Sequence, residues 1–182
     1  MVDLDGTLAR TAEANLLAYT AALSEVGVTI SPERFAASVQ GRNWREFLPS
    51  VLSDAGVQAD PAAVARRKTE LYRTMLPAIA INLPLVALIE TCRDRLQMRT
   101  ALVTSASRAS VTELLKVHDL TRLFDTVVTG DDVKHHKPDP EAYALAATQL
   151  GVSPEESLVY EDAEVGVASA TQFGAHVIRV IF

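Results

Sequence analysis

Two carboxylates separated by one residue stand near the start of the chain, in Asp3-Leu4-Asp5-Gly6-Thr7. A carboxylate that attacks phosphorus, with a metal ion beside it, gives phosphoryl transfer through an aspartyl phosphate. A second carboxylate close by can protonate the leaving oxygen and later deprotonate a water molecule. The structural alternative is a turn after a strand, with Gly6 as its left-handed residue. The pair therefore points to phosphate chemistry if further suitable groups lie near it.

Further groups of this kind follow later short apolar segments. A hydroxyl or backbone N–H group at Ser105, together with the amine of Lys137, could hold phosphate oxygens. Glu161-Asp162 could complete a metal site with the first two aspartates, because ligand sets made only of oxygen suit Mg²⁺. Four carboxylates at one place would repel each other unless a cation lay among them. The structural alternatives are a solvated loop lysine and a helix cap.

Other polar residues nearby carry weaker signals. Asp131-Asp132 is interpreted as a cap or a turn rather than as a pair of ligands. His135 and His136 precede Lys137 and could add positive potential near a phosphate, but a surface loop is the favoured interpretation. Arg66-Arg67-Lys68 is interpreted as a solvated helix face.

The elements that must position these groups are strands that alternate with helices from Leu83 onwards. Alternation of this kind predicts a parallel sheet covered on both faces. Each polar group then lies at the carboxyl end of a strand, and these ends form the edge of an open sheet where ligands bind. The predicted strands cover residues 1–4, 100–104, 126–129, 157–160 and 176–181, and the predicted helices between them cover residues 107–117, 140–150 and 163–173.

From about Ala9 to Ile81 the pattern is almost wholly helical. Ser31-Pro32 and Asp60-Pro61 each have the pattern of an N-cap followed by proline at the first helical position. An apolar stripe at helical spacing comprises Trp44, Phe47, Leu48, Val51 and Leu52. The sequence therefore predicts an α/β core with a Rossmann-like parallel sheet, formed by residues 1–8 and 83–182, and an inserted helical cap of residues 9–82.

The composition limits the class of protein. The formal net charge of −6 argues against a nucleic-acid binder that relies on phosphate contacts. Cys92 is the only cysteine, which excludes an intrachain disulfide and agrees with a reducing cytoplasm. The most apolar stretch, residues 76–89, is too short and too broken to span a bilayer, and no signal pattern opens the chain. We expect a cytoplasmic protein, a monomer or weak dimer, that binds a small phosphorylated metabolite and neither nucleic acid nor membrane.

Four segments resemble the haloacid dehalogenase superfamily, in the subgroup that includes β-phosphoglucomutase and phosphoglycolate phosphatase. They occur in the family's order over nearly the whole chain, as residues 2–8, 101–105, 137–140 and 160–162. The resemblance implies an α/β core with an inserted helical cap. It also implies Mg²⁺-dependent hydrolysis of a small phosphomonoester, such as a sugar phosphate or phosphoglycolate, through an aspartyl phosphate.

The same resemblance implies a role for each matching residue. Asp3 corresponds to the nucleophile and Asp5 to the general acid and base. Gly41-Arg42-Asn43-Trp44-Arg45 resembles the family's substrate loop, in which Arg42 is the candidate contact for an anionic or polyhydroxylated substrate. Trp44 is expected in the core of the cap. The remaining implied roles are phosphate binding by Thr104, Ser105 and Ala106, charge neutralisation by Lys137, and Mg²⁺ binding by Asp3, the carbonyl of Asp5 and Asp162, with Glu161 beside them.

Departures from the pattern separate the activities found in the superfamily. The presence of Asp5 favours phosphate over halide chemistry. Lys68, the cap's one lysine, comes too late for the Schiff-base lysine of phosphonatases. Ser107-Arg108 resembles the segment with which β-phosphoglucomutases hold a second phosphate, but Asn15 and Ala109 replace their histidine and asparagine. A hydrolase is therefore favoured, with a mutase and a non-catalytic phosphate-binding regulator as alternatives.

The first strand is short. Two residues precede Asp3, whereas strands usually have about five or six residues. We therefore expect the natural protein to start earlier, and also to end later, than this chain.

Overall fold

The computed structural model describes residues 1–39 and 42–182. The strands form two parallel pairs, β1 (Ala101–Val103) with β2 (Thr126–Val128) and β3 (Leu158–Glu161) with β4 (His176–Arg179). Val2 joins the pairs, because it forms parallel bridges to Leu102 of β1 and to Tyr160 of β3. The spatial order is therefore β2, β1, Val2, β3, β4, and the predicted α/β class is confirmed.

The expectation of a first strand over residues 1–4 is wrong. Val2 makes bridges to both neighbours, but the chain turns away at Leu4, whose carbonyl accepts hydrogen bonds from the N–H groups of Leu8 and Ala9. The turn begins at Leu4, so the segment that pairs with β1 and β3 ends at Asp3. The N–H of Asp3 still donates to the carbonyl of Tyr160 at 3.0 Å. The central position of the sheet thus leads directly into Asp3.

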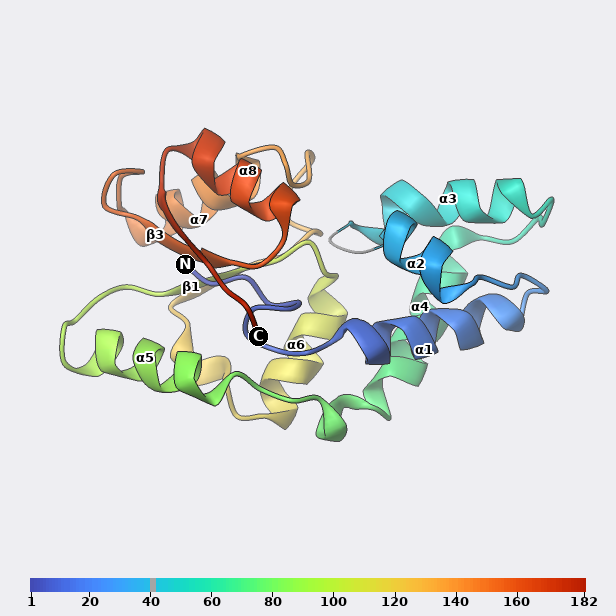
Figure 1. Cartoon of the computed structure of the whole chain (residues 1–182), viewed down its shortest axis with the longest axis horizontal. Coiled ribbons are helices and arrows are strands. Elements are labelled where there is room, and N and C mark those ends of the chain that lie inside the picture. Colours follow the sequence, from blue (N-terminus) through green and yellow to red (C-terminus); the bar gives the residue numbers. More distant parts are fainter. Residues whose placement is uncertain (40–41) are drawn as a thin grey trace.

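Helices cover both faces of the sheet, because the residues of β1 point alternately to its two faces. Leu102 belongs to an apolar cluster with α5 (Leu83–Asp94) and α6 (Arg108–Val117). Ala101 and Val103 belong to a second cluster with α7 (Glu141–Leu150) and α8 (Glu164–Phe173). Figure 1 shows α7 and α8 on one side of the strands and α5 and α6 on the other.

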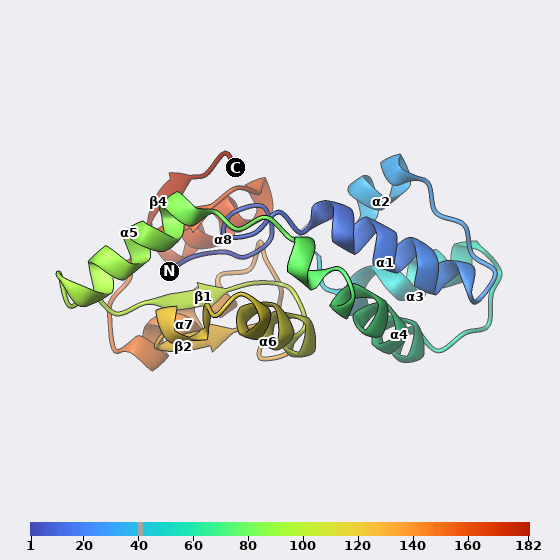
Figure 2. The ribbon, with the colours of Figure 1, turned by 90° about the horizontal axis from the view of Figure 1, so that it is seen from below.

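The predicted helical segment consists of α1 (Ala12–Ser24), α2 (Pro32–Val39), α3 (Trp44–Asp54) and α4 (Pro61–Arg73). It has an apolar core of its own, and both ribbon views place it to one side of the sheet (Figures 1 and 2). The expected caps are present, since Asp60 accepts a 2.9 Å hydrogen bond from the N–H of Ala62, and Ser31 accepts one of 3.2 Å from that of Arg34. The division into residues 1–8 with 83–182 and 9–82 stays a prediction.

Two chain segments lead into and out of these helices side by side. Ala9 forms an antiparallel bridge with Ile81, and the N–H of Arg10 donates to the carbonyl of Ala80 at 2.9 Å. A 3₁₀ helix, η1 (Leu76–Ala78), precedes the outgoing segment, and another, η2 (Thr121–Leu123), lies between α6 and β2. The paired segments tie the residues just before α1 to the residues just before α5.

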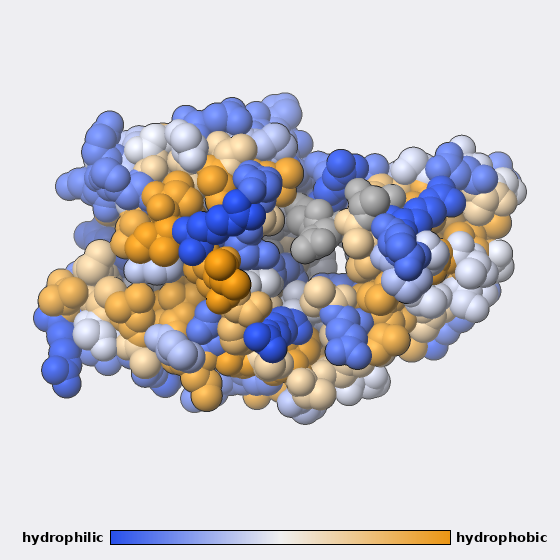
Figure 3. Space-filling model, in the orientation of Figure 1, coloured by the Kyte–Doolittle hydropathy of each residue, from blue (hydrophilic) through white to orange (hydrophobic). Residues whose placement is uncertain are grey.

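Among the described residues, no helix is both long enough and apolar enough to cross a bilayer. Figure 3 shows apolar residues gathered over α5 and towards the C-terminal end. Leu83, Leu88, Ile178 and Ile181 are among the exposed large apolar side chains.

Candidate active site

A cavity of about 550 Å³ lies between the carboxyl ends of the strands and the helices α1 to α4. Its sheet side carries the groups that the strand pattern predicted, and its helical side carries Tyr19, Phe35 and Tyr72. The structure brings every predicted site residue to this one cavity, namely Asp3, Asp5, Arg42, Thr104, Ser105, Ala106, Lys137, Glu161 and Asp162. Gly41, with which the expected substrate loop begins, lies outside the described residues.

Lys137 lies between two buried carboxylates. Its Nζ is 2.8 Å from Oδ1 of Asp3 and 2.7 Å from Oε2 of Glu161, and it also donates to the carbonyl of Val103 at 3.1 Å. Burial by itself lowers the pKa of Lys137, but the charges of Asp3 and Glu161 outweigh this effect, so its pKa lies well above the ordinary value. Lys137 is therefore a permanent cation at the base of the cavity.

Asp3 has more negative charge around it than Lys137 neutralises. Burial, and next the carboxylate of Glu161, raise the pKa of Asp3 well above its ordinary value, although Lys137 acts in the opposite direction. Burial also raises the pKa of Asp162, whose Oδ1 accepts a 3.0 Å hydrogen bond from Thr7. The site thus favours the addition of positive charge, either as protons or as a metal cation.

The acidic groups have the composition and spacing of a site for a hard divalent cation. Carboxylate oxygens of Asp3, Glu161 and Asp162 lie within 4.8 Å of one another. Oxygen ligands of this kind suit Mg²⁺ and leave room for water and substrate oxygens. Gly6 allows the carboxylate of Asp162 to lie against the backbone of the first turn. A Cβ atom at Gly6, whose φ is +92°, would lie 2.2 Å from Oδ2 of Asp162.

A second group of possible metal ligands comprises His135, Asp139 and Glu141. Hydrogen bonds within the loop explain why these side chains lie together. The carboxylate of Glu141 accepts hydrogen bonds of 2.9 Å from the N–H groups of Lys134 and His135. Asp139 accepts one of 2.9 Å from the N–H of Glu141. These contacts order the loop of residues 134–141, which carries Lys137 and leads into α7.

Asp5 is held by three side chains, of which Thr104 alone was a predicted site residue. Thr11 donates to Oδ1 of Asp5, Asn15 donates to the same oxygen at 3.3 Å, and Thr104 donates to Oδ2 at 3.3 Å. Thr11 and Asn15 lie at the start of α1, directly after the turn that carries Asp5. Their closeness to Asp5 in the sequence was the available signal, but only the course of the turn shows that they face it.

Lys68 corrects the interpretation of residues 66–68 as a solvated face. Arg66 and Arg67 are exposed, but Lys68 is only 6% exposed, and its Nζ lies 4.8 Å from the ring centre of Tyr19 and 4.2 Å from that of Tyr72. The reason is helical periodicity, because Val64, Lys68 and Tyr72 are four residues apart and share the buried face of α4. Burial lowers the pKa of Lys68 to about 8.

The segment at the start of α3 brings residues of the expected substrate loop to the cavity. Arg42 is exposed and lines the cavity. Trp44 is half-buried, and it packs on the helical core while also lining the cavity.

The loops after β2 carry the two aspartates and two histidines with weaker signals. Asp132 accepts a 2.7 Å hydrogen bond from the N–H of Thr129, as expected for a turn, but Asp131 lines the cavity as well. The side chain of His136 is only 10% exposed, so the surface-loop interpretation holds for His135 and is wrong for His136. Its Nε2 lies 4.0 Å from Oε1 of Glu46 in α3, a neighbour that the local sequence does not reveal.

The fold and the acidic cavity define a hydrolase of the α/β class with its site at the strand ends, and the sequence model of the haloacid dehalogenase-like hydrolases matches residues 1–180. The chain belongs to this family and is an enzyme of the hydrolase class, as the resemblance implied.

Individual relatives are similar over nearly all of the chain. It is 33% identical over 179 residues to fructose-1-phosphate phosphatase YqaB from Escherichia coli, covering 98% of this chain and 93% of that one. It is 32% identical over 180 residues to hexitol phosphatase A from the same organism, covering 99% and 81% of the two chains. The structure of CbbY from Rhodobacter sphaeroides in complex with phosphate superposes with a TM-score of 0.91 at 27% identity, over 100% of this chain and 84% of that one.

Proposed function

We propose that this protein is a Mg²⁺-dependent phosphatase that hydrolyses a small phosphomonoester, with a sugar phosphate as the expected substrate class, through phosphate held covalently on Asp3. The observation that carries the proposal is the contact of Lys137 with Asp3 at the base of a cavity that also holds Asp5 and Asp162. The phosphatase activities named for the relatives support the reaction, and two of these relatives are named for sugar or hexitol phosphates.

The reaction uses Asp3 and Asp5 in two successive steps. An oxygen of Asp3 forms a bond to phosphorus while the bond from phosphorus to the leaving oxygen breaks, and Asp5 gives its proton to that oxygen. A water molecule then attacks phosphorus, Asp5 takes a proton from it, and the bond to Asp3 breaks to release inorganic phosphate. Thr11, Asn15 and Thr104 hold the carboxylate of Asp5 during both proton transfers.

The phosphate oxygens need positive charge and N–H donors as their charge is rearranged. Lys137 supplies a cation next to Asp3, and the loop of residues 104–106 supplies hydroxyl and N–H groups. Asp3, the carbonyl of Asp5 and Asp162 would hold Mg²⁺, which supplies charge neutralisation of the nucleophile and the phosphate. Glu161 lies beside these ligands, where its carboxylate accepts hydrogen bonds from Lys137 and from Tyr143 at 2.8 Å.

The position of Arg108 disfavours the mutase alternative. Its guanidinium group pairs with Asp132 and donates to the carbonyl of Val127 at 3.1 Å. It is absent from the cavity lining, although Ser107 and Ala109 on either side belong to it. A second phosphate in the cavity would therefore lack the cation that the resemblance to β-phosphoglucomutase requires. The non-catalytic alternative is disfavoured by the complete acidic set, since buried carboxylates raise each other's pKa without a cation.

Mg²⁺-dependent turnover of p-nitrophenyl phosphate, followed by a panel of sugar phosphates and phosphoglycolate, tests the proposal. We expect steady release of phosphate with Mg²⁺, loss of turnover after treatment with EDTA, and recovery when Mg²⁺ is restored. Turnover that survives complete removal of divalent cations would contradict the proposed site. The cytoplasmic location, the monomer or weak dimer, and the absence of nucleic-acid and membrane partners stay predictions.

A further inference from the structure

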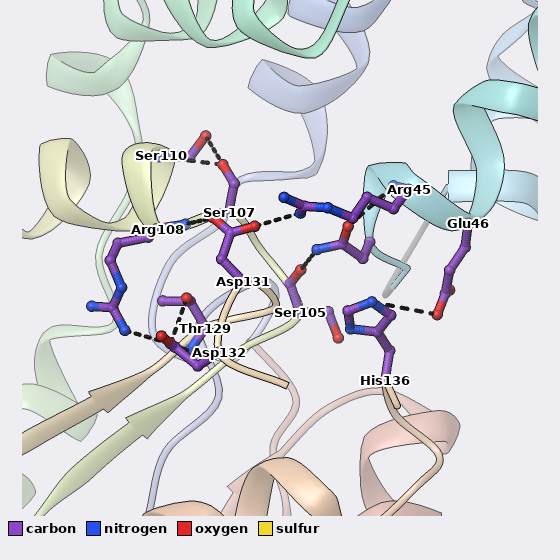
Figure 4. A network of polar contacts seen from close by, with 11 residues as sticks. Arg45, Glu46, Ser105, Ser107, Arg108, Ser110, Thr129, Asp131, Asp132 and His136 are labelled. Atoms are coloured by element: carbon purple, nitrogen blue, oxygen red, sulfur yellow. Dashed lines mark hydrogen bonds and ion pairs between the residues drawn. The ribbon is translucent and has the colours of Figure 1, made fainter. Parts of the chain in front are cut away.

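The start of α3 contacts the sheet edge at three places (Figure 4). Asn43 donates a 3.0 Å hydrogen bond to the carbonyl of Ser105. Arg45 pairs with Asp131. Glu46 and His136 approach to 4.0 Å. The residues on the sheet side belong to the loops that follow β1 and β2 and to the loop that carries Lys137.

Asn43 uses both ends of its amide. Its Oδ1 accepts a 3.1 Å hydrogen bond from the N–H of Arg45 and so caps α3, while its Nδ2 donates to Ser105. The residue is only 1% exposed, so both bonds are shielded from solvent. Gly130 permits the contact, because a Cβ there would lie 2.3 Å from Nδ2 of Asn43 and 2.4 Å from the carbonyl oxygen of Ser105.

Asp131 also bonds in two directions. One carboxylate oxygen accepts from the guanidinium group of Arg45, and the other accepts a 2.8 Å hydrogen bond from the N–H of Arg108, the first residue of α6. Ser105 lies near the start of the short loop between β1 and α6, and Arg108 directly follows its end. The loop is therefore held from both sides by groups that also contact α3.

We propose that Asn43 and Asp131 are positioning residues: they fix the loop of residues 104–107 to the start of α3, so that the loop is ordered for phosphate only while α3 is in place. The proposal rests on the proposed function, since this loop is the expected phosphate site. It goes further in making phosphate affinity depend on Asn43, which belongs to the segment that resembles the substrate loop, and on Asp131, which belongs to none of the four motif segments. Neither residue needs to touch the phosphate. The effect is local, because each bond ends on the backbone of the loop or of α6.

Asn43→Asp separates the two functions of Asn43. Aspartate has nearly the same shape, keeps the oxygen that caps α3, and is favoured at a helix N-terminus. It lacks the N–H group that bonds to Ser105. Asn43→Ser is the second variant, because serine also caps helices but is too short to replace the amide contact. Arg34→Gln is the matched control, since the Arg34–Asp54 pair also ends on α3 but is exposed and remote from the loop.

Binding of inorganic phosphate in the presence of Mg²⁺, measured by titration calorimetry, is the first readout and requires no turnover. We expect Kd to rise about three- to tenfold in both Asn43 variants, the range for loss of one hydrogen bond. Arg45→Gln should weaken binding less, since that ion pair is half exposed. Arg34→Gln should leave the affinity unchanged, and the urea midpoint of Asn43→Asp should stay close to that of the wild type.

Amide hydrogen exchange of residues 104–108 is the second readout and requires no ligand. We expect faster exchange there in both Asn43 variants and in Asp131→Ala, with unchanged exchange in β4. Unchanged exchange of the loop, or unchanged phosphate affinity, in a folded Asn43→Asp protein would overturn the proposal. If the wild type binds no phosphate while its loop exchange responds to Asn43→Asp, the proposed function fails and the positioning of the loop stands.

Discussion

The ammonium group of Lys68 donates a 2.6 Å hydrogen bond to Oδ1 of Asn15, and this bond decides which way the amide of Asn15 faces. With its oxygen turned to Lys68, the amide presents its N–H₂ group to Asp5 at 3.3 Å. Lys68 belongs to α4 and Asn15 to α1, so two helices of the predicted cap jointly orient the carboxylate that we propose as acid and base.

The first prediction concerns the pH dependence of stability that Lys68 causes. Burial lowers its pKa to about 8 in the folded protein, against about 10.4 in the unfolded chain. Between these values the unfolded chain binds the additional proton, so the free energy of unfolding rises with pH from about 8 to 10. The rise should amount to about 2 to 3 kcal/mol.

Urea unfolding of the wild type and of Lys68→Met at pH 7.5, 8.5 and 9.5 measures this effect. The wild type should gain stability relative to Lys68→Met as the pH rises. Lys116→Met, on the exposed face of α6, is the control and should follow the wild type. Parallel curves for the wild type and Lys68→Met would show that Lys68 keeps its proton throughout this range.

The second prediction is that Asp5→Asn loses most turnover and keeps metal binding. The carbonyl of Asp5, which is the proposed ligand, is unchanged by this substitution, whereas the carboxylic acid that moves the proton is lost. General acid and base catalysis contributes about 10²- to 10⁴-fold in rate, and kcat should fall by this factor. Steady-state kinetics, with Mg²⁺ titrated by calorimetry, checks both parts, and near wild-type turnover would remove Asp5 from its proposed role.

The third prediction is that Asp3→Asn abolishes turnover while the protein stays folded. An amide is no nucleophile towards phosphorus, so kcat should fall by about 10⁴ or more. Stability without Mg²⁺ should not decrease by much, because Glu161 still pairs with Lys137 at 2.7 Å and one crowded carboxylate is removed.

Chemical trapping identifies the residue that carries phosphate. Quenching the wild type during turnover and reducing the acyl phosphate with borohydride converts the modified aspartate to homoserine, which mass spectrometry locates in the sequence. We expect homoserine at position 3. Modification of another aspartate would assign the nucleophile to that residue instead.

The sheet edge could be predicted from the sequence because its groups obey local rules. Asp3, Thr104 and Glu161 each stand at or directly after the carboxyl end of a short apolar run, and parallel strands bring such positions together. Lys137 belongs to the motif segment of residues 137–140, and its Nζ lies 2.8 Å from Oδ1 of Asp3. The strand pattern and the motif segments are therefore enough to bring these residues to one edge of the sheet.

The helical side of the cavity could not be predicted in the same way. Lys68 is buried because Val64 and Tyr72 share its helix face, but a lysine in a basic run usually indicates solvent. Asn43 contacts Ser105, and Asp131 contacts Arg45. In both pairs the two residues are more than 60 positions apart in the sequence. Such contacts depend on how α3 is placed against the sheet, which local patterns do not specify.

The fourth prediction concerns Lys137 as the counter-charge of two buried acids. Its Nζ contacts Asp3 and Glu161 at 2.8 and 2.7 Å, and all three side chains are at most 8% exposed. Lys137→Met removes the cation and leaves the carboxylates without compensation. In the absence of Mg²⁺ we expect the free energy of unfolding at pH 7.5 to fall by about 3 to 5 kcal/mol, the range for breaking a buried ion pair from one side.

The pKa of Asp3 decides how the free energy of unfolding of Lys137→Met changes with pH. Burial and the charge of Glu161 already raise the pKa of Asp3 in the folded wild type, and loss of Lys137 removes the main opposing effect. A folded-state pKa above the unfolded value means that the folded protein binds more protons, so stability falls as the pH rises through that interval. Lys137→Met should therefore be closer to the wild type at pH 5.5 than at pH 7.5.

A double variant separates charge from packing. Glu161→Gln in the Lys137→Met background removes one of the uncompensated acids with almost no change in volume, and should recover part of the lost stability at pH 7.5. Adding Mg²⁺ should stabilise Lys137→Met, because a bound cation takes over part of the compensation of Asp3. Urea unfolding with EDTA and with excess Mg²⁺ measures both effects. If Lys137→Met loses the same stability at both pH values and gains nothing from Glu161→Gln, the lysine stabilises the site by packing rather than by charge.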